Sequence, residues 1–144
     1  FCKAFKKLKK TNHNINLYLE NNVISSENFK NFGENFFMLT NAKEYIELKK
    51  LIDFQLILDV AHLKVSCKTL NLNFQNELDY LIQQSNYIHI SDNNALADQN
   101  KSITKNSELY GLLSKYSFKN KIVTIEVYEE INKVINSYNL INKL

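Results

Sequence analysis

The sequence predicts an α/β fold in which four parallel strands with outer helices form part of a parallel β/α barrel. Three observations predict it. Four short apolar runs recur along the chain, segments with helical spacing separate them, and each run has one apolar face and one mixed face. A doubly wound sheet would be apolar on both faces, whereas a barrel places a polar mouth at the carboxyl ends of its strands.

The predicted strands are rich in Ile, Leu, Val or Tyr and have the usual strand length. They are Ile15–Glu20, Gln55–Asp59, Tyr87–Ser91 and Lys121–Val127. Helical spacing of apolar residues precedes, separates and follows these strands. The predicted helices are Phe1–Lys10, Lys43–Ile52, Gln75–Gln84, Ser107–Lys115 and Tyr128–Asn139. Strands that alternate with helices of about ten residues are typical of βα units around a parallel sheet.

The third predicted strand shows the two faces most clearly. Ile88 and Ile90 lie on one face, and Tyr87, His89 and Ser91 lie on the other. The first and fourth strands alternate in the same way, so the apolar face is expected to meet the helices and the mixed face to line the lumen.

Length and composition limit the number of domains and the class of protein. The 144 residues fit a single domain, 1–144, with 44% hydrophobic and 23% charged residues. No apolar run approaches the roughly 18 residues that a membrane span needs. Cys2 and Cys67 form no CxxC pair, so we expect reduced thiols and a cytoplasmic location.

The charge is weak evidence about partners. The net charge is +3, and all 18 basic residues are lysines. Nucleic-acid binders favour arginine for two-pronged contacts with phosphate and guanine, so a nucleic-acid partner is not expected. His13 lies in an asparagine-rich turn and receives no role.

One titratable side chain stands at or near the carboxyl end of each predicted strand. These residues are Glu20, Asp59, His89 and Glu126. Adjacent barrel strands would bring them together, and three converging carboxylates would repel one another unless a cation neutralised them. Carboxylates combined with imidazole suit Mn²⁺, Mg²⁺, Zn²⁺ or Fe²⁺.

Two local motifs at these positions resemble a known group of proteins. Asp59-Val-Ala-His62 ends the second strand and His89-Ile-Ser-Asp92 ends the third. With Glu20-Asn21 before them and Glu126 after them, they resemble the pattern of the xylose-isomerase-like TIM barrel superfamily. That group includes sugar-phosphate isomerases and epimerases and apurinic endonucleases. The resemblance implies a partial (β/α)8 TIM barrel comprising strands five to eight, the C-terminal half.

The resemblance also implies a site and a reaction. Glu20, Asp59, His89 and Glu126 would bind a divalent metal (Mn, Zn or Mg), and Glu20 and Glu126 would act as the acid/base pair. His62, Asp92 and Asn21 would contact substrate. The expected activity is a sugar or sugar-phosphate isomerase or epimerase that transfers a proton through an enediolate.

Two alternatives stay open because the chain departs from the family pattern. An apurinic-endonuclease-like metal phosphodiesterase would need further ligands, and Asn100 stands where that branch has a metal-binding histidine. A non-catalytic truncated barrel is favoured by Ala95, in a region where epimerases tend to carry an arginine, and by Lys101-Ser102 in place of glycines. A half-barrel would also need a second copy or an N-terminal half-barrel as its partner.

Overall fold

The computed structural model describes residues 1–11, 14–33 and 36–144. His13 lies outside the described residues. The strands are β1 (Tyr18–Glu20), β2 (Gln55–Asp59), β3 (Ser85–Ile90) and β4 (Ile122–Ile125). The helices are α1 (Cys2–Thr11), α2 (Ser26–Phe32), α3 (Ala42–Leu51), α4 (Val60–Thr69), α5 (Phe74–Gln84), α6 (Glu108–Leu113) and α7 (Ile131–Ile141).

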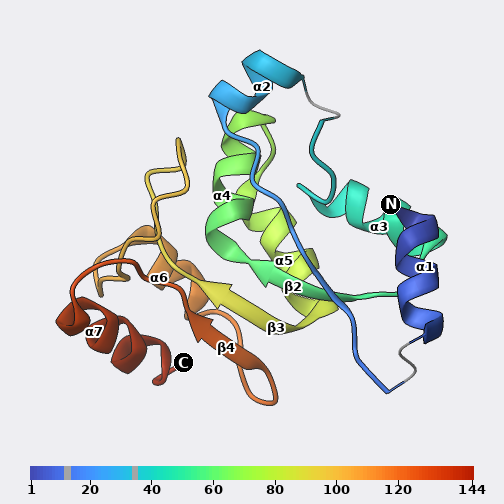
Figure 1. The fold of residues 1–144 in the computed structure, drawn as a ribbon. Helices are drawn as coiled ribbons and strands as arrows, with labels where there is room; N and C mark the ends of the chain where they lie inside the picture. The colour runs from blue at the N-terminus through green and yellow to red at the C-terminus, as the bar shows by residue number, and fades with distance from the viewer. Residues whose placement is uncertain (12–13, 34–35) are drawn as a thin grey trace.

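The four strands form one sheet in chain order, and every neighbouring pair is parallel (Figure 1). The carboxyl ends of the strands therefore lie along the same edge of the sheet. The register places Asp59 of β2 opposite His89 of β3, and His89 opposite Thr124 of β4. This arrangement confirms the prediction of parallel strands with flanking helices.

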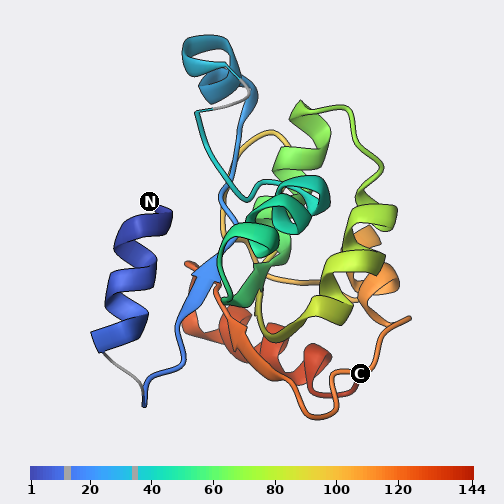
Figure 2. The same ribbon diagram turned by 90° about the vertical axis from the view of Figure 1, so that its right-hand side faces the viewer.

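One face of the sheet packs against helices and forms the core. Helices α4 and α5 contact the two central strands, and α7 contacts β4. Figure 2 shows α3, α4 and α5 gathered on one side of the strands. Leu58 of β2 and Ile88 of β3 are fully buried beneath these helices, with Leu63 of α4 and Leu78 of α5. Burying a side chain of this size stabilises a fold by roughly 1.5–3 kcal/mol.

The opposite face of the sheet is mixed and half-buried. It carries Tyr18, Ile57, Tyr87 and Thr124, one from each strand. The Thr124 hydroxyl lies 3.2 Å from the Tyr87 hydroxyl, and the ring of Tyr18 meets that of Tyr87 edge-on at 5.8 Å. These aromatic side chains lie on the same face of the sheet as the titratable residues at the strand ends.

Several element boundaries differ from the sequence-based expectation. The first strand begins at Tyr18 rather than Ile15, which is 56% exposed, and the fourth strand ends at Ile125 rather than Val127. Helices α2 and α4 were not predicted. Helix α4 begins directly after β2 and buries residues on most of its circumference, so it has no amphipathic period to detect.

Within the described residues, no helix combines the length and the apolar character needed to cross a membrane.

Candidate metal centre

The carboxyl ends of the four strands supply one titratable side chain each. Glu20 ends β1, Asp59 ends β2, His89 is the penultimate residue of β3 and Glu126 directly follows β4. Each offers a ligand atom, and these atoms all lie within 4.8 Å of one another. The structure therefore brings together the whole predicted ligand set, which we call the strand-end cluster.

The Nδ1 atom of His89 lies between the three carboxylates. It is 2.9 Å from Glu126 Oε2, 3.3 Å from Glu20 Oε1 and 4.0 Å from Asp59 Oδ2. The cluster is unevenly covered, because the Asp59 side chain is only 1% exposed whereas that of Glu20 is 38% exposed. Its open side is thus the side of β1.

The cluster contains polar atoms that the protein leaves without hydrogen bonds. Among the described residues, four buried side-chain polar atoms lack a hydrogen bond, and three of them are Asp59 Oδ2, His89 Nδ1 and Glu126 Oε2. His89 Nδ1 and Glu126 Oε2 are close, but their directions do not fit a hydrogen bond. Buried polar groups are rarely left unsatisfied, and each costs about 1–3 kcal/mol. Two carboxylate oxygens and an imidazole nitrogen within 4.8 Å of one another fit a small divalent cation.

Asp59 is fixed in place by its other oxygen. Its Oδ1 accepts a hydrogen bond of 2.7 Å from the backbone N–H of His62, and so caps the first turn of α4. Burial raises the pKa of Asp59 to about 6, an effect that His62 opposes and that Glu20 and Glu126 reinforce. In the metal-free centre this carboxyl group therefore keeps its proton to a higher pH than an exposed aspartate does, and a cation would compete with that proton.

Asn21, predicted to contact substrate, is buried and holds the main chain of Asp59. Its side-chain N–H donates to the carbonyl of Asp59 at 3.0 Å, and its Oδ1 accepts from the N–H of Asp59 at 2.7 Å. The amide thereby ties the end of β1 to the end of β2. Its predicted contact with substrate remains a prediction.

His62 lies at the edge of the cluster, and an oxygen atom that can accept a hydrogen bond lies near each of its ring nitrogens. Nδ1 is 2.8 Å from the carbonyl oxygen of Asn21, and Nε2 is 3.2 Å from Asp98 Oδ2. Burial lowers the pKa of His62, but the charge of Asp59, the Asn21 carbonyl and the charges of Asp98 and Glu20 outweigh it, and the pKa is raised. A carbonyl oxygen can only accept, so Nδ1 carries a proton. His62 supplies hydrogen-bonding capacity beside the cluster rather than a ligand atom within it.

Asp92, also predicted to contact substrate, faces a lysine. Its Oδ1 lies 2.6 Å from Lys64 Nζ, and Lys64 also donates to the carbonyl of Asn93 at 2.7 Å. Through its backbone, Asp92 pairs with Lys101 and closes the intervening loop. The structure does not bring this carboxylate into the strand-end cluster, and its contact with substrate remains a prediction.

Three residues that contact the predicted site residues were not themselves predicted. Lys64 engages Asp92, Asp98 engages His62, and the hydroxyl of Tyr128 donates to Glu126 Oε1 at 2.7 Å. Asp98 and Tyr128 reach the site through loop geometry, which a residue pattern does not encode.

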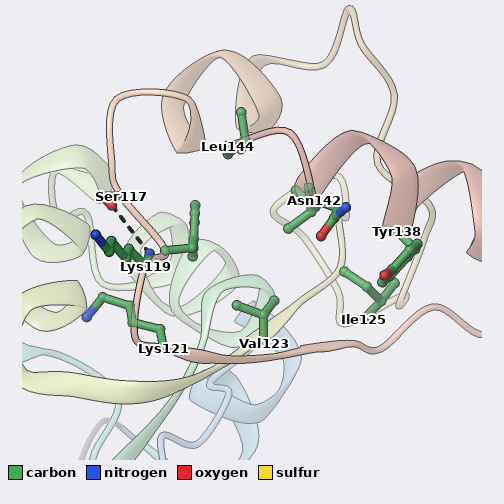
Figure 3. A pocket seen from close by; sticks show the side chains of 10 residues that line it. Ser117, Lys119, Lys121, Val123, Ile125, Tyr138, Asn142 and Leu144 are labelled. Carbon is green, nitrogen blue, oxygen red and sulfur yellow. Dashed lines mark hydrogen bonds between the residues drawn. The ribbon is translucent and has the colours of Figure 1, made fainter.

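A cavity of about 420 Å³ lies elsewhere, between β4 and α7 (Figure 3). Val123 and Ile125 of β4 and Tyr138 of α7 line it, and Lys119 and Lys121 stand at one end. None of the strand-end residues lines this cavity. The charged groups and unsatisfied atoms thus locate the candidate chemistry better than cavity volume does.

Comparison with known proteins supports the architecture. Neither a protein-family model nor a curated protein matches this chain significantly. A solved structure described as a D-tagatose 3-epimerase-like protein aligns with 99% of this chain at a TM-score of 0.71 and 17% sequence identity. The alignment covers 52% of that protein, so this chain spans about half its length. At this identity the likeness shows the fold alone: an α/β sheet of four parallel strands with flanking helices, consistent with a partial barrel.

Proposed function

We propose that the strand-end cluster binds a divalent metal and serves a sugar or sugar-phosphate isomerase or epimerase reaction. The observation that carries the proposal is the convergence of Asp59 Oδ2, His89 Nδ1 and Glu126 Oε2, all buried without hydrogen bonds, beside Glu20. The fold shared with an epimerase-like protein supports the choice of reaction class.

The proposed ligands are Glu20, Asp59, His89 and Glu126. Mn²⁺, Zn²⁺ and Mg²⁺ suit this set of oxygens and one nitrogen. A bound divalent cation would supply positive charge that offsets the negative charge developing on the substrate oxygens.

Glu20 and Glu126 are the proposed acid/base pair, one at the carboxyl end of each outer strand of the sheet. One carboxylate accepts the proton from the carbon next to the substrate carbonyl, and the electrons of that C–H bond form an enediolate. The other carboxyl group returns a proton to carbon, so that the carbonyl moves or the configuration inverts. Glu20 is the more accessible of the two, with 38% of its side chain exposed against 24% for Glu126.

His62 is the proposed substrate contact. Its ring is held between Asn21 and Asp98, and its pKa is raised, so it offers a fixed donor at the edge of the cluster. Nε2 faces Asp98 Oδ2 at 3.2 Å, so a substrate hydroxyl or carbonyl oxygen would bind His62 by sharing or replacing that partner. Such a contact would compensate in part for the arginine that this sequence lacks.

The experiment follows proton exchange and metal binding separately. Titration calorimetry with Mn²⁺ tests the centre, and the apo protein prepared with EDTA is the baseline. Ketoses and ketose phosphates are then incubated in D₂O, and ¹H NMR follows loss of the proton next to the carbonyl. Exchange that needs both Mn²⁺ and Glu20, and that Glu20→Gln abolishes, is the expected result. No Mn²⁺ binding at micromolar concentration contradicts the proposed function.

The phosphodiesterase alternative has its own readout. The side chain of Asn100, at the position of the histidine in that branch, accepts a hydrogen bond of 3.4 Å from Ser91. Cleavage of an oligonucleotide that contains an abasic site, without proton exchange in any sugar, would favour that alternative.

A further inference from the structure

The two carboxylate oxygens of Glu126 have different surroundings. Oε2 lies in the strand-end cluster, 2.9 Å from His89 Nδ1, and is buried without a hydrogen bond. Oε1 accepts a hydrogen bond of 2.7 Å from the hydroxyl of Tyr128. The two residues follow β4 two positions apart, and in extended chain such positions face the same side. The hydrogen bond from Tyr128 therefore holds Oε1 of the carboxylate, while Oε2, which has no hydrogen bond, lies in the cluster.

Tyr128 is itself anchored by its backbone. Its N–H donates to the carbonyl of Asn100 at 2.9 Å, and Asn100 is buried, with a positive φ of 45°. The loop that precedes Asn100 thus fixes the main chain of Tyr128, although 74% of the tyrosine surface is exposed.

The two carboxylate oxygens of Asp59 also have different surroundings. Its Oδ1 is used by the backbone N–H of His62, and its Oδ2 is left for the cluster. Two of the three carboxylates thus have one oxygen committed to the protein and one facing the centre. A carboxylate held in this way is poised to bind a cation through a single oxygen.

We propose that Tyr128 is a positioning residue for Glu126, which it holds so that Oε2 alone is presented to the metal. The inference rests on the proposed metal-binding function. Ca²⁺ takes six to eight oxygens and commonly binds both oxygens of a carboxylate, whereas Mg²⁺, Mn²⁺ and Zn²⁺ accept fewer ligands. The hydrogen bond from Tyr128 therefore favours the smaller cations over Ca²⁺.

The test removes one hydroxyl group. Tyr128→Phe deletes the donor and keeps the exposed ring, and Tyr138→Phe on α7 is the matched control, an exposed tyrosine away from the cluster. Each variant is compared with the wild type by Mn²⁺ titration calorimetry, by Ca²⁺ competition against Mn²⁺, by the visible spectrum with Co²⁺ and by urea unfolding without metal.

The expected result is specific to Tyr128. Loss of a hydrogen bond to a metal ligand commonly weakens metal binding 10–100-fold, and we expect about a tenfold rise in the Mn²⁺ Kd for Tyr128→Phe. The Co²⁺ spectrum changes and Ca²⁺ competes better, because both oxygens of Glu126 become free to bind, while the urea midpoint stays at the wild-type value. Tyr138→Phe behaves as wild type throughout.

Two results would overturn the inference, and they are distinguishable. Mn²⁺ binding by Tyr128→Phe that is equal to or tighter than wild type, with an unchanged Co²⁺ spectrum, overturns the role of Tyr128 alone. Absence of Mn²⁺ binding in the wild type overturns the proposed function, and the inference with it.

Discussion

Asn21 and Asp59 are joined by a pair of hydrogen bonds across the ends of β1 and β2. The Asn21 side chain donates to the Asp59 carbonyl at 3.0 Å and accepts from the Asp59 N–H at 2.7 Å. A side chain thus continues the pairing of the two strands to the point where the strand-end cluster begins. The main chain that carries Asp59 is held by an amide that is itself 2% exposed.

Removal of this amide should destabilise the fold. In Asn21→Ala the N–H and carbonyl of Asp59 lose their partners in a buried place, at a cost of about 1–3 kcal/mol each, so we expect a loss of roughly 2–4 kcal/mol. Urea unfolding of the metal-free protein measures it. Asn22→Ala is the control, because Asn22 is exposed and its amide donates a single bond to Met38. Equal losses in both variants would contradict the special role of Asn21.

Neutralising Glu126 separates metal binding from folding. We expect Glu126→Gln to weaken Mn²⁺ binding by at least about tenfold, because one anionic ligand becomes a neutral amide. The metal-free protein should keep its stability or gain some, since the crowded carboxylates repel one another less. Equilibrium dialysis and urea unfolding give the two readouts. Glu130→Gln is the matched control: Glu130 precedes α7 without a side-chain capping bond. Identical Mn²⁺ binding in wild type and Glu126→Gln would refute the assignment of Glu126 as a ligand.

The metal-free protein should lose stability as pH rises from about 5 to 7. Burial raises the pKa of Asp59 to about 6, so the folded state keeps a proton that the unfolded chain releases near pH 4. The pKa of His62 is raised as well, and its contribution is present below pH 6.5 and is lost as pH rises through the folded value. Both groups act in one direction. We expect a fall of roughly 1–3 kcal/mol, since each pKa unit corresponds to about 1.4 kcal/mol.

Saturating Mn²⁺ should reverse this dependence, because protons compete with the cation for the same atoms. Urea unfolding at pH 5, 6 and 7, with EDTA and with Mn²⁺, gives both profiles. Asp59→Asn should flatten the metal-free profile while its side-chain oxygen still caps α4. A metal-free protein that is most stable at pH 7 would contradict the assignment of a raised Asp59 pKa.

The periodicity of apolar residues predicted the strands and their faces. It did not predict the contacts that depend on the path of the loops. The alternation of Ile88 and Ile90 against Tyr87 and His89 predicted which face of β3 meets the helices. Because the strands are parallel, one residue per strand end was enough to predict the cluster. Helix α4 was missed because its buried residues cover most of its surface.

The details of the centre depend on contacts between distant residues. Asp92 binds Lys64, which lies 28 residues away in the sequence, and His62 contacts Asp98, which lies 36 residues away. Such partners depend on the path of the loop between Asp92 and Lys101, which has no period. Tyr128, an exposed tyrosine after a strand, carries no sequence signal that separates it from any other surface tyrosine.

The last prediction concerns the two edges of the sheet. Among the described residues, β1 pairs with β2 alone and β4 pairs with β3 alone, so each has an open edge. Ile122 of β4 is 57% exposed, and Ile15, just before β1, is 56% exposed. Open strand edges with exposed apolar side chains recruit other chains. This supports the proposal that residues 1–144 form one domain with the architecture of a half-barrel.

The isolated chain should therefore associate with itself at micromolar concentration, most simply as a two-fold dimer. Light scattering coupled to size exclusion measures the mass. Ile122→Lys should shift the chain toward the monomer, because a charge on an open strand opposes pairing. Leu51→Lys, a change at an exposed apolar residue at the end of α3, is the control and should leave the mass unchanged. A wild-type monomer of 16.9 kDa that unfolds cooperatively would contradict the half-barrel proposal, because such a sheet would then be stable with both edges open.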